Sequence, residues 1–262
     1  MFNASKLVIV VCVLTLAGNA FALNPNAFTG TINDDWATGG NWTSGVAPIT
    51  EDVSIRAAAV IAQSTTASAN ILRVGNSAYG PTEVGSIVID GSLTTLYDIR
   101  IAEGTGVNGT ITVNAGAILD NRTSAAVGEL AVGYGGTGTL NVYGTVYTKS
   151  MDITNWGSPT SSTGIVNVFA GGIVVDSGRL TVGAWGGNGS LVIYEGGSFS
   201  CGDNWSGQLQ NFIDNGYIRA ATGATLVVTN HTLDAGKTFT AVPEPATMLL
   251  VGVGSMLLRR RK

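Results

Sequence analysis

The sequence predicts an all-β protein that folds as a single-stranded parallel β-helix, a coil of short strands and turns closed by a cap at each end. Its 262 residues include 37 glycines and only 11% charged residues, which favours short strands and turns over long helices. The stretch 130–147 also has recognisable copies on both sides. Each copy alternates apolar and small polar residues, the period of a half-buried strand. One copy cannot bury its own apolar side, whereas a stack of copies can.

Charge and cysteine content exclude several classes of function. The net charge is -4, and basic residues gather at the two ends of the chain, so the central body is clearly acidic. Nucleic acid is therefore not an expected partner, because neutralising phosphates requires a basic face. Cys12 lies in an N-terminal apolar run, which leaves Cys201 without a partner for an internal disulfide. With one histidine in the chain, we expect neither a metal site nor a cofactor.

Residues 1–22 have the three parts of a secretory signal peptide. Lys6 is followed by an apolar run from Leu7 to Ala17 and then by Ala20-Phe21-Ala22, a small-residue cleavage site. The run is too short for a spanning helix. We therefore expect the mature chain to begin at Leu23.

Residues 23–71 are expected to form an N-terminal cap and the first coils. Trp36 and Trp42 stand six residues apart among glycines. A solenoid exposes its core at each end, so these rings are predicted to plug the open end of the stack. Stacking of the rings against sugars is the alternative.

Residues 72–203 are expected to form the β-helical repeats. Successive units are predicted to begin at Leu72, Ile99, Leu130, Ile153 and Leu180. The central strands are Ile87-Val88-Ile89, Ile111-Thr112-Val113, Leu140-Asn141-Val142, Val166-Asn167-Val168 and Leu191-Val192-Ile193. Their outer residues are always aliphatic and are expected to face inward, with the middle residue outward. A third strand carries Ile118, Val146, Val174 or Phe199 as its inward residue.

Residues 204–242 are expected to form a C-terminal cap. Leu209, Phe212 and Ile213 have helical spacing, and Gly216 would end the helix. Three strand-like segments follow, at 217–219, 225–228 and 238–242. The alternative fold is a β-sandwich of jelly-roll type, whose strands pair antiparallel. Leu140 lying directly between Ile111 and Val166 would decide for the β-helix.

The tail, residues 243–262, has three parts in order. Pro243, Glu244 and Pro245 form a rigid hinge, an apolar segment runs to Leu258, and the chain closes with the basic residues Arg259, Arg260, Arg261 and Lys262. The basic cluster is a membrane stop that prefers the cytoplasmic side. The apolar segment would span about 20 Å as a helix, against a hydrocarbon core of about 30 Å. It is short for a permanent anchor and adequate for a transient one.

This tail closely resembles the PEP-CTERM sorting signal of exported bacterial proteins. The resemblance implies recognition and processing by an exosortase, export from a Gram-negative cell to the envelope, surface or extracellular matrix, and an association with exopolysaccharide. A generic C-terminal membrane anchor is the alternative. The glycine-rich units and Asn41-Trp42 also resemble autotransporter-type repeats. By analogy with other parallel β-helices, the coil is expected to be right-handed.

The acidic residues do not indicate an enzyme. A polysaccharide-cleaving β-helix needs acids clustered on one face. Here the acids are spread over the units at predicted turns, where they are expected to bond their own backbone. They are Asp90, Asp120, Asp152, Asp176, Asp203 and Asp214. Asp120 and Asp176 are expected to occupy equivalent places, and His231 is expected on the surface. No catalytic residue is assigned, and a polysaccharide-degrading enzyme is the least favoured hypothesis.

Aromatic residues recur at one position of three consecutive units. Tyr143, Phe169 and Tyr194 follow the central strands directly, and Trp156 and Trp185 fall in the first turn of the later two units. These residues either pack as a ladder or form a platform for sugar rings. The sequence therefore favours an exported structural protein of the surface or matrix, with a carbohydrate-binding adhesin as the alternative.

Overall fold

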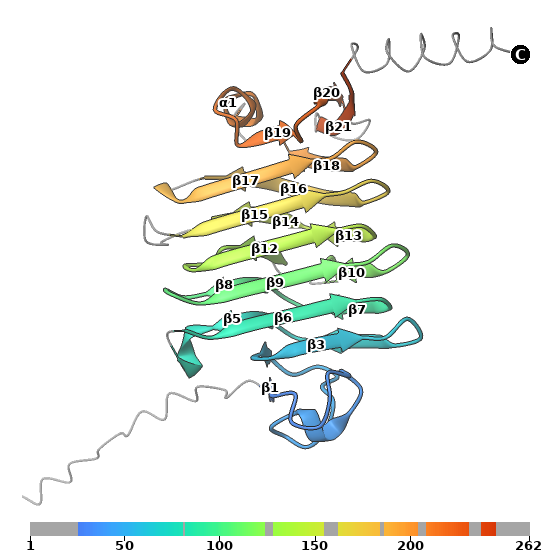
Figure 1. Ribbon diagram of the computed structural model, residues 1–262, viewed down its shortest axis with the longest axis vertical. Coiled ribbons are helices and arrows are strands. Elements are labelled where there is room, and N and C mark those ends of the chain that lie inside the picture. The colour runs from blue at the N-terminus through green and yellow to red at the C-terminus, as the bar shows by residue number, and fades with distance from the viewer. Residues whose placement is uncertain are drawn as a thin grey trace, which may run out of the picture.

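The computed structural model shows a parallel β-solenoid (Figure 1). The structure describes residues 26–80, 82–123, 128–154, 162–183, 186–203, 208–230 and 237–244. The predicted signal peptide, Trp156, Trp185, His231 and the tail beyond Glu244 lie outside these residues. Within the described residues, no helix is both long enough and apolar enough to cross a membrane.

Three sheets, here called A, B and C, run along the solenoid. Sheet A contains β1 (Asn26–Phe28), β2 (Val53–Ile55), β5 (Leu72–Asn76), β8 (Ile99–Glu103), β11 (Glu129–Val132), β14 (Ser150–Ile153) and the second half of β16 (Ile173–Val182). Sheet B contains β3 (Ala58–Ile61), β6 (Val84–Ile89), β9 (Asn108–Val113), β12 (Thr137–Val142), β15 (Thr163–Val168), β17 (Asn188–Ile193) and β19 (Ile218–Ala220). Sheet C contains β4 (Thr66–Ala69), β7 (Ser92–Thr95), β10 (Ile118–Asp120), β13 (Thr145–Thr148), the first half of β16, β18 (Ser198–Asp203), β21 (Lys237–Pro243) and β20 (Ala224–Asn230).

Each coil contributes one strand to each sheet, and the strands of successive coils pair in parallel. In Figure 1 the chain crosses the near face from left to right and returns behind it while it rises from β1 to β18, so the coil is right-handed. Leu140 pairs with Ile111 on one side and with Val166 on the other. This register confirms the predicted β-helix and excludes the antiparallel jelly roll.

The core is a continuous apolar column inside the coil. In the central strands the burial alternates strictly, with Leu140 and Val142 fully buried and Asn141 half-buried on the outside. The same pattern repeats in β9 and β15. The predicted inward and outward positions of these strands are therefore confirmed.

Two register assignments from the sequence are wrong. Leu130 pairs with Met151, and Met151 with Leu180, so Met151 and not Ile153 begins its unit. A shift of two residues keeps every side chain on the same face, so periodicity alone cannot detect it. In the third strand Leu119 is the inward residue and Ile118 is 41% exposed. Both are aliphatic, so the alternation there is ambiguous.

The corner between sheets A and B requires a left-handed backbone in successive coils. The residues with positive φ at this corner are Gly75, Ala102, Gly133, Thr154 and Gly183. Each follows the last inward residue of its sheet A strand. Gly133 has φ +78°, and a Cβ there would lie 2.4 Å from the carbonyl oxygen of Thr163. The glycines thus allow neighbouring coils to approach closely at the corner.

The N-terminal end is closed by an aromatic cluster. Trp36 and Trp42 are buried and meet edge to face at 4.7 Å between ring centroids, and Phe28 packs on Trp42 at 5.1 Å. The indole nitrogen of Trp42 donates to the Trp36 carbonyl. A short 3-10 helix, η1 (Gly39–Asn41), precedes Trp42, and a second, η2 (Ser77–Tyr79), follows β5. The two tryptophans therefore act as the predicted plug, and their burial excludes sugar stacking.

The C-terminal end is closed by a helix and an antiparallel ribbon. Helix α1 (Gln208–Asp214) buries Leu209 and Phe212, and it is followed by Gly216 at φ +72°, as predicted. Strand β21 pairs antiparallel with both β18 and β20. Its last residue, Pro243, lies opposite Ala224.

Candidate functional site

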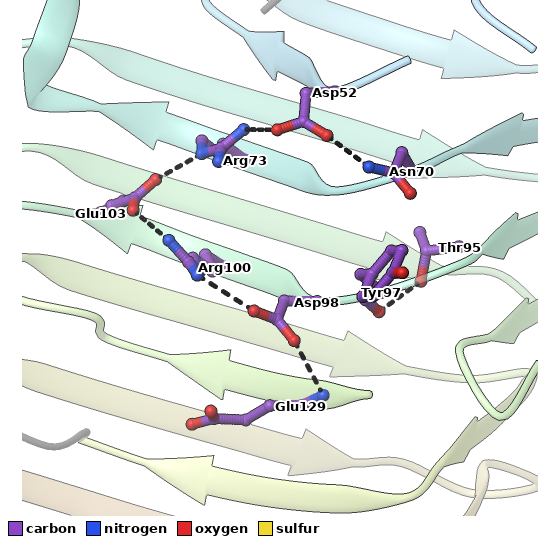
Figure 2. Close-up of polar contacts among 9 residues, drawn as sticks. All are labelled: Asp52, Asn70, Arg73, Thr95, Tyr97, Asp98, Arg100, Glu103 and Glu129. Atoms are coloured by element: carbon purple, nitrogen blue, oxygen red, sulfur yellow. Dashed lines mark hydrogen bonds and ion pairs between the residues drawn. The ribbon is translucent and has the colours of Figure 1, made fainter. Parts of the chain in front are cut away.

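A ribbon of charged side chains runs along the outer face of sheet A (Figure 2). We call it the charged ribbon, and its members are Asp52, Arg73, Asp98, Arg100, Glu103, Glu129, Asp152 and Arg179. Arg73 and Arg100 are register partners. Each is the middle, outward residue between two inward aliphatic residues. The alternation of the strands therefore places both guanidinium groups on one face.

Ion pairs link successive coils within the charged ribbon. Arg73 lies 3.2 Å from Asp52 and 2.8 Å from Glu103. Arg100 lies 2.6 Å from Glu103 and 3.0 Å from Asp98. Burial by itself would lower the pKa of Arg100, but the hydrogen bonds and charges of Glu103 and Asp98 outweigh it and raise that pKa above its ordinary value. Arg100 is therefore a fixed cation, and the ion pairs of Arg73 and Arg100 form one structural network.

The far end of the charged ribbon holds a pair of carboxyl groups. Burial, followed by the hydrogen bond and the charge of Asp152, raises the pKa of Glu129 to about 8. The charge of Asp98 acts in the same direction and that of Arg100 opposes it. Asp152 is only 4% exposed, and its Oδ2 lies 3.7 Å from Nη2 of Arg179. At neutral pH the Glu129 carboxyl thus stays protonated and donates a hydrogen bond to Asp152.

This carboxyl pair is poorly arranged for glycoside cleavage. Two carboxyl groups that cleave a glycosidic bond flank that bond about 5 to 5.5 Å apart in retaining enzymes, and about 6.5 to 9.5 Å apart in inverting enzymes, where a water fits between. Glu129 and Asp152 are hydrogen-bonded to each other, and Asp152 is nearly closed off from solvent. The pair acts as a proton-linked contact between neighbouring coils. The absence of enzymatic activity stays a prediction.

Sequence reasoning missed the charged ribbon. It treated Asp152 as a turn former, whereas Asp152 lies within β14 and is buried. One signal in the sequence could have revealed the charged ribbon. In three sheet A strands the residue between the two inward apolar residues is charged, namely Arg73, Arg100 and Asp152. The central strands, which show the repeat most clearly, do not carry this charge.

Two other aspartates do form turns, as predicted. Asp120 Oδ1 accepts from the backbone N–H of Arg122 at 2.9 Å, and Asp176 Oδ1 accepts from that of Gly178 at 3.0 Å. They do not occupy equivalent places, because Asp120 pairs with Tyr147 and Asp176 with Thr148. The wrong alignment follows from the misassigned inward residue of β10.

Asp176 belongs to a polar column inside the corner between sheets C and A. The column comprises Thr95, Asn121, Thr148, Asp176 and Cys201, all fully or almost fully buried. Burial raises the pKa of Asp176 to about 7. The Cys201 side chain is a thiol and not part of a disulfide, and it donates weakly to the carbonyl of Lys237. The thiol is closed off from solvent.

The three predicted aromatic residues form a stacked ladder on the outside of the coil. The rings of Tyr143 and Phe169 stack almost parallel, with centroids 4.2 Å apart and 3° between the planes. Phe169 and Tyr194 lie 4.5 Å apart at 22°. Both faces of the Phe169 ring are thus covered by Tyr143 and Tyr194, so Phe169 offers a ligand only its ring edge. Sugar binding by these residues, and by Trp156 and Trp185, stays a prediction.

The sorting segment begins inside the folded body. Pro243 is the last residue of β21, and the N–H of Glu244 lies 3.4 Å from the carbonyl of Gly223. No spacer therefore separates the C-terminal cap from this segment. Pro245 and the basic residues Arg259, Arg260, Arg261 and Lys262 lie beyond the described part of the chain.

These features define a right-handed β-solenoid protein that carries a C-terminal sorting segment. Residues 241–262 match the family model described as the PEP-CTERM protein-sorting motif. The match indicates an exported protein that is targeted to an exosortase-type processing enzyme and to the cell envelope or surface. Comparison with curated proteins and with solved structures found no match. The resemblance to autotransporter-type repeats is consistent with the solenoid and stays a prediction at the level of the family.

Proposed function

We propose that the protein is a non-enzymatic structural component of the cell surface or extracellular matrix of a Gram-negative bacterium. The observation that carries this proposal is a rigid solenoid, capped at both ends and joined without a spacer to a sorting motif. A body of this kind keeps its shape outside the cell without disulfides. Its tail enters the membrane at least transiently, and an exosortase-type enzyme then removes it.

The internal contacts support a structural role. On sheet A, ion pairs of Arg73 connect its coil to the coils before and after it. The aromatic ladder links three consecutive coils. Such contacts stabilise the interfaces between repeats, on which the stability of a solenoid depends.

The test is the C-terminus of the mature protein. Mass spectrometry of material released from cells is expected to show no peptide containing Arg259 to Lys262. The variant Glu244→Ala is expected to accumulate in the membrane fraction with its tail intact. Glu195→Gln, an exposed change in the body, serves as the control and is expected to be processed normally. Released wild-type protein that retains Met248 to Lys262 would contradict processing.

A second candidate is a carbohydrate-binding adhesin, with exopolysaccharide as its partner. The aromatic ladder favours it, because Tyr143 is 38% exposed and stacks on Phe169 at the end of the ladder. Tyrosines of this kind serve at surfaces where one side of the ring is packed and the other is wet.

A further inference from the structure

The outer face of sheet B carries no charged side chain over five consecutive coils. We call it the neutral face and define it by the outward residues of β6, β9, β12, β15 and β17. These are the hydroxyl residues Ser86, Thr110, Thr112, Thr137, Thr139, Thr163 and Ser190, the amides Asn108, Asn141, Asn167 and Asn188, and the aliphatic residues Val84, Val88, Ile165 and Val192. The contrast with the charged ribbon on sheet A is complete.

The neutral face is a regular lattice. The strands pair in unbroken register, so Thr139 lies between Thr110 and Ile165. Neighbouring rows are about 4.8 Å apart along the solenoid axis, and outward residues along a strand are about 6.6 Å apart. Almost all of the outward side chains are half-buried or exposed. Asn167 donates to Asn141 at 2.9 Å, which orients the amides along the axis.

The aromatic ladder borders this lattice. Tyr143, Phe169 and Tyr194 each stand two residues after the last outward position of β12, β15 and β17, and so continue the same face. Their stacked rings form an apolar wall parallel to the axis. Polar rows beside an aromatic wall provide both the hydrogen bonds and the apolar contact that a sugar chain requires.

The chemistry of the neutral face excludes other classes of partner. Nucleic acids and anionic polymers need cations, which the face lacks. A second protein copy would need an apolar centre rich in aromatic residues, whereas serine is depleted in such interfaces. An uncharged, hydroxyl-rich polymer remains, because its hydroxyls can donate to and accept from Ser, Thr and Asn.

We propose that the neutral face binds an extended, uncharged polysaccharide that lies along the solenoid axis beside the aromatic ladder. The repeat of about 4.8 Å per coil is close to the length of one sugar residue in an extended chain, so each coil contacts about one residue. This inference rests on the proposed location of the protein at the cell surface. It places the sugar across the strands and not between the aromatic rings, which already stack on one another.

Retention of the mature full-length protein on immobilised polysaccharides tests the proposal. The probes are microcrystalline cellulose, cross-linked dextran, the neutral polysaccharide fraction of the producing cells, and alginate as an anionic polymer. Retention by at least one neutral probe, with none on alginate, is the expected result. Equal retention on alginate, or no retention on any neutral probe, overturns it.

Variants locate the binding surface. Thr139→Glu places a charge at the centre of the neutral face and is expected to lower affinity at least tenfold. Val175→Glu, at a half-buried outward position of sheet C, is the matched control and is expected to bind as wild type. If Thr139→Glu does not fold by circular dichroism, the near-isosteric Thr139→Val replaces it and is expected to reduce affinity several-fold. Unchanged binding in a folded variant overturns the proposal.

Two further measurements separate the possible failures. In analytical sedimentation the wild type is expected to remain unassociated. Self-association of the wild type that Thr139→Glu abolishes would show that a second copy of the chain occupies the neutral face, and would overturn the proposal. Cell fractionation reports export independently of binding. A variant that reaches the surface and is processed, yet no longer binds, supports the polysaccharide site. Wild-type protein that reaches the surface and binds no neutral probe refutes this inference alone.

Discussion

At the scale of single residues, the carboxyl pair makes stability depend on pH. The pKa of Glu129 rises to about 8 in the folded protein because the group is buried and hydrogen-bonded to Asp152. In the unfolded chain the same carboxyl ionises near its ordinary pKa of about 4.3. Its favourable contribution is therefore fully present below about pH 4.3 and is lost as the pH rises through about 8. Asp176, with a pKa raised to about 7, acts in the same direction.

Glu129→Gln is expected to flatten this dependence. Between pH 5 and pH 8.5 the free energy of unfolding of the wild type should fall by on the order of 4 kcal/mol more than that of the variant. The amide keeps a donor for Asp152 and cannot ionise. Urea denaturation at several pH values measures the difference, and the exposed Glu195→Gln is the control. Parallel curves for wild type and Glu129→Gln would refute the assignment.

The left-handed corner gives a second prediction at this scale. Gly133→Ala is expected to lower the free energy of unfolding by more than about 2 kcal/mol, because the left-handed conformation of a residue with a Cβ costs about 1 to 2 kcal/mol. The new Cβ would also clash with Thr163, 2.4 Å away.

Gly116→Ala is the matched control for Gly133→Ala. Gly116 has a similar φ of +82° and nothing within 4 Å of its added Cβ. It should lose only the conformational contribution. If chemical denaturation gave equal losses of unfolding free energy for Gly133→Ala and Gly116→Ala, the close approach of neighbouring coils at Gly133 would not contribute.

At the scale of the strands, the aromatic ladder is expected to stabilise the interfaces between coils. Phe169→Ala removes two stacked contacts and Tyr143→Ala removes one. At about 0.5 to 1.5 kcal/mol per contact, the loss of unfolding free energy at Phe169 should be about twice that at Tyr143. Denaturant titration checks the order, with the exposed Ile173→Ala as the control. A larger effect at Tyr143 would contradict the ladder.

The strands also show what the sequence predicts and what it does not. The central strands were predicted because their aliphatic pairs, such as Leu140 and Val142, flank a polar residue in most units. Met151 and Leu119 were missed because neighbouring apolar residues allow more than one register. The charged ribbon was missed because its members are far apart in sequence, and only the register of sheet A brings Arg73 and Arg100 together. The unequal lengths of the corner turns hide that register.

At the scale of the whole molecule, stability is a sum over neighbouring coils, so the caps protect the ends. Trp42→Ala is expected to lower the free energy of unfolding of the first coil by about 3 to 5 kcal/mol. Hydrogen exchange should then show faster exchange in β2, β3 and β4, with protection retained in β12, β15 and β17. Uniform loss of protection along the chain would contradict this repeat-by-repeat behaviour. The exposed change Ile49→Ala is the control.

The junction at Pro243 bears on how the solenoid is oriented while its tail is bound at the membrane. The chain leaves the folded body directly from a paired strand, and the N–H of Glu244 still lies 3.4 Å from the carbonyl of Gly223. If the tail enters the membrane as proposed, the C-terminal cap lies close to the lipid headgroups and the tryptophan plug becomes the distal tip, about 30 Å away. The solenoid axis then lies along the membrane normal, and the three sheets run parallel to that axis. In the proposed function, cleavage would then release a body that has already folded, and the processing enzyme would meet its recognition sequence at the membrane-proximal end of the solenoid.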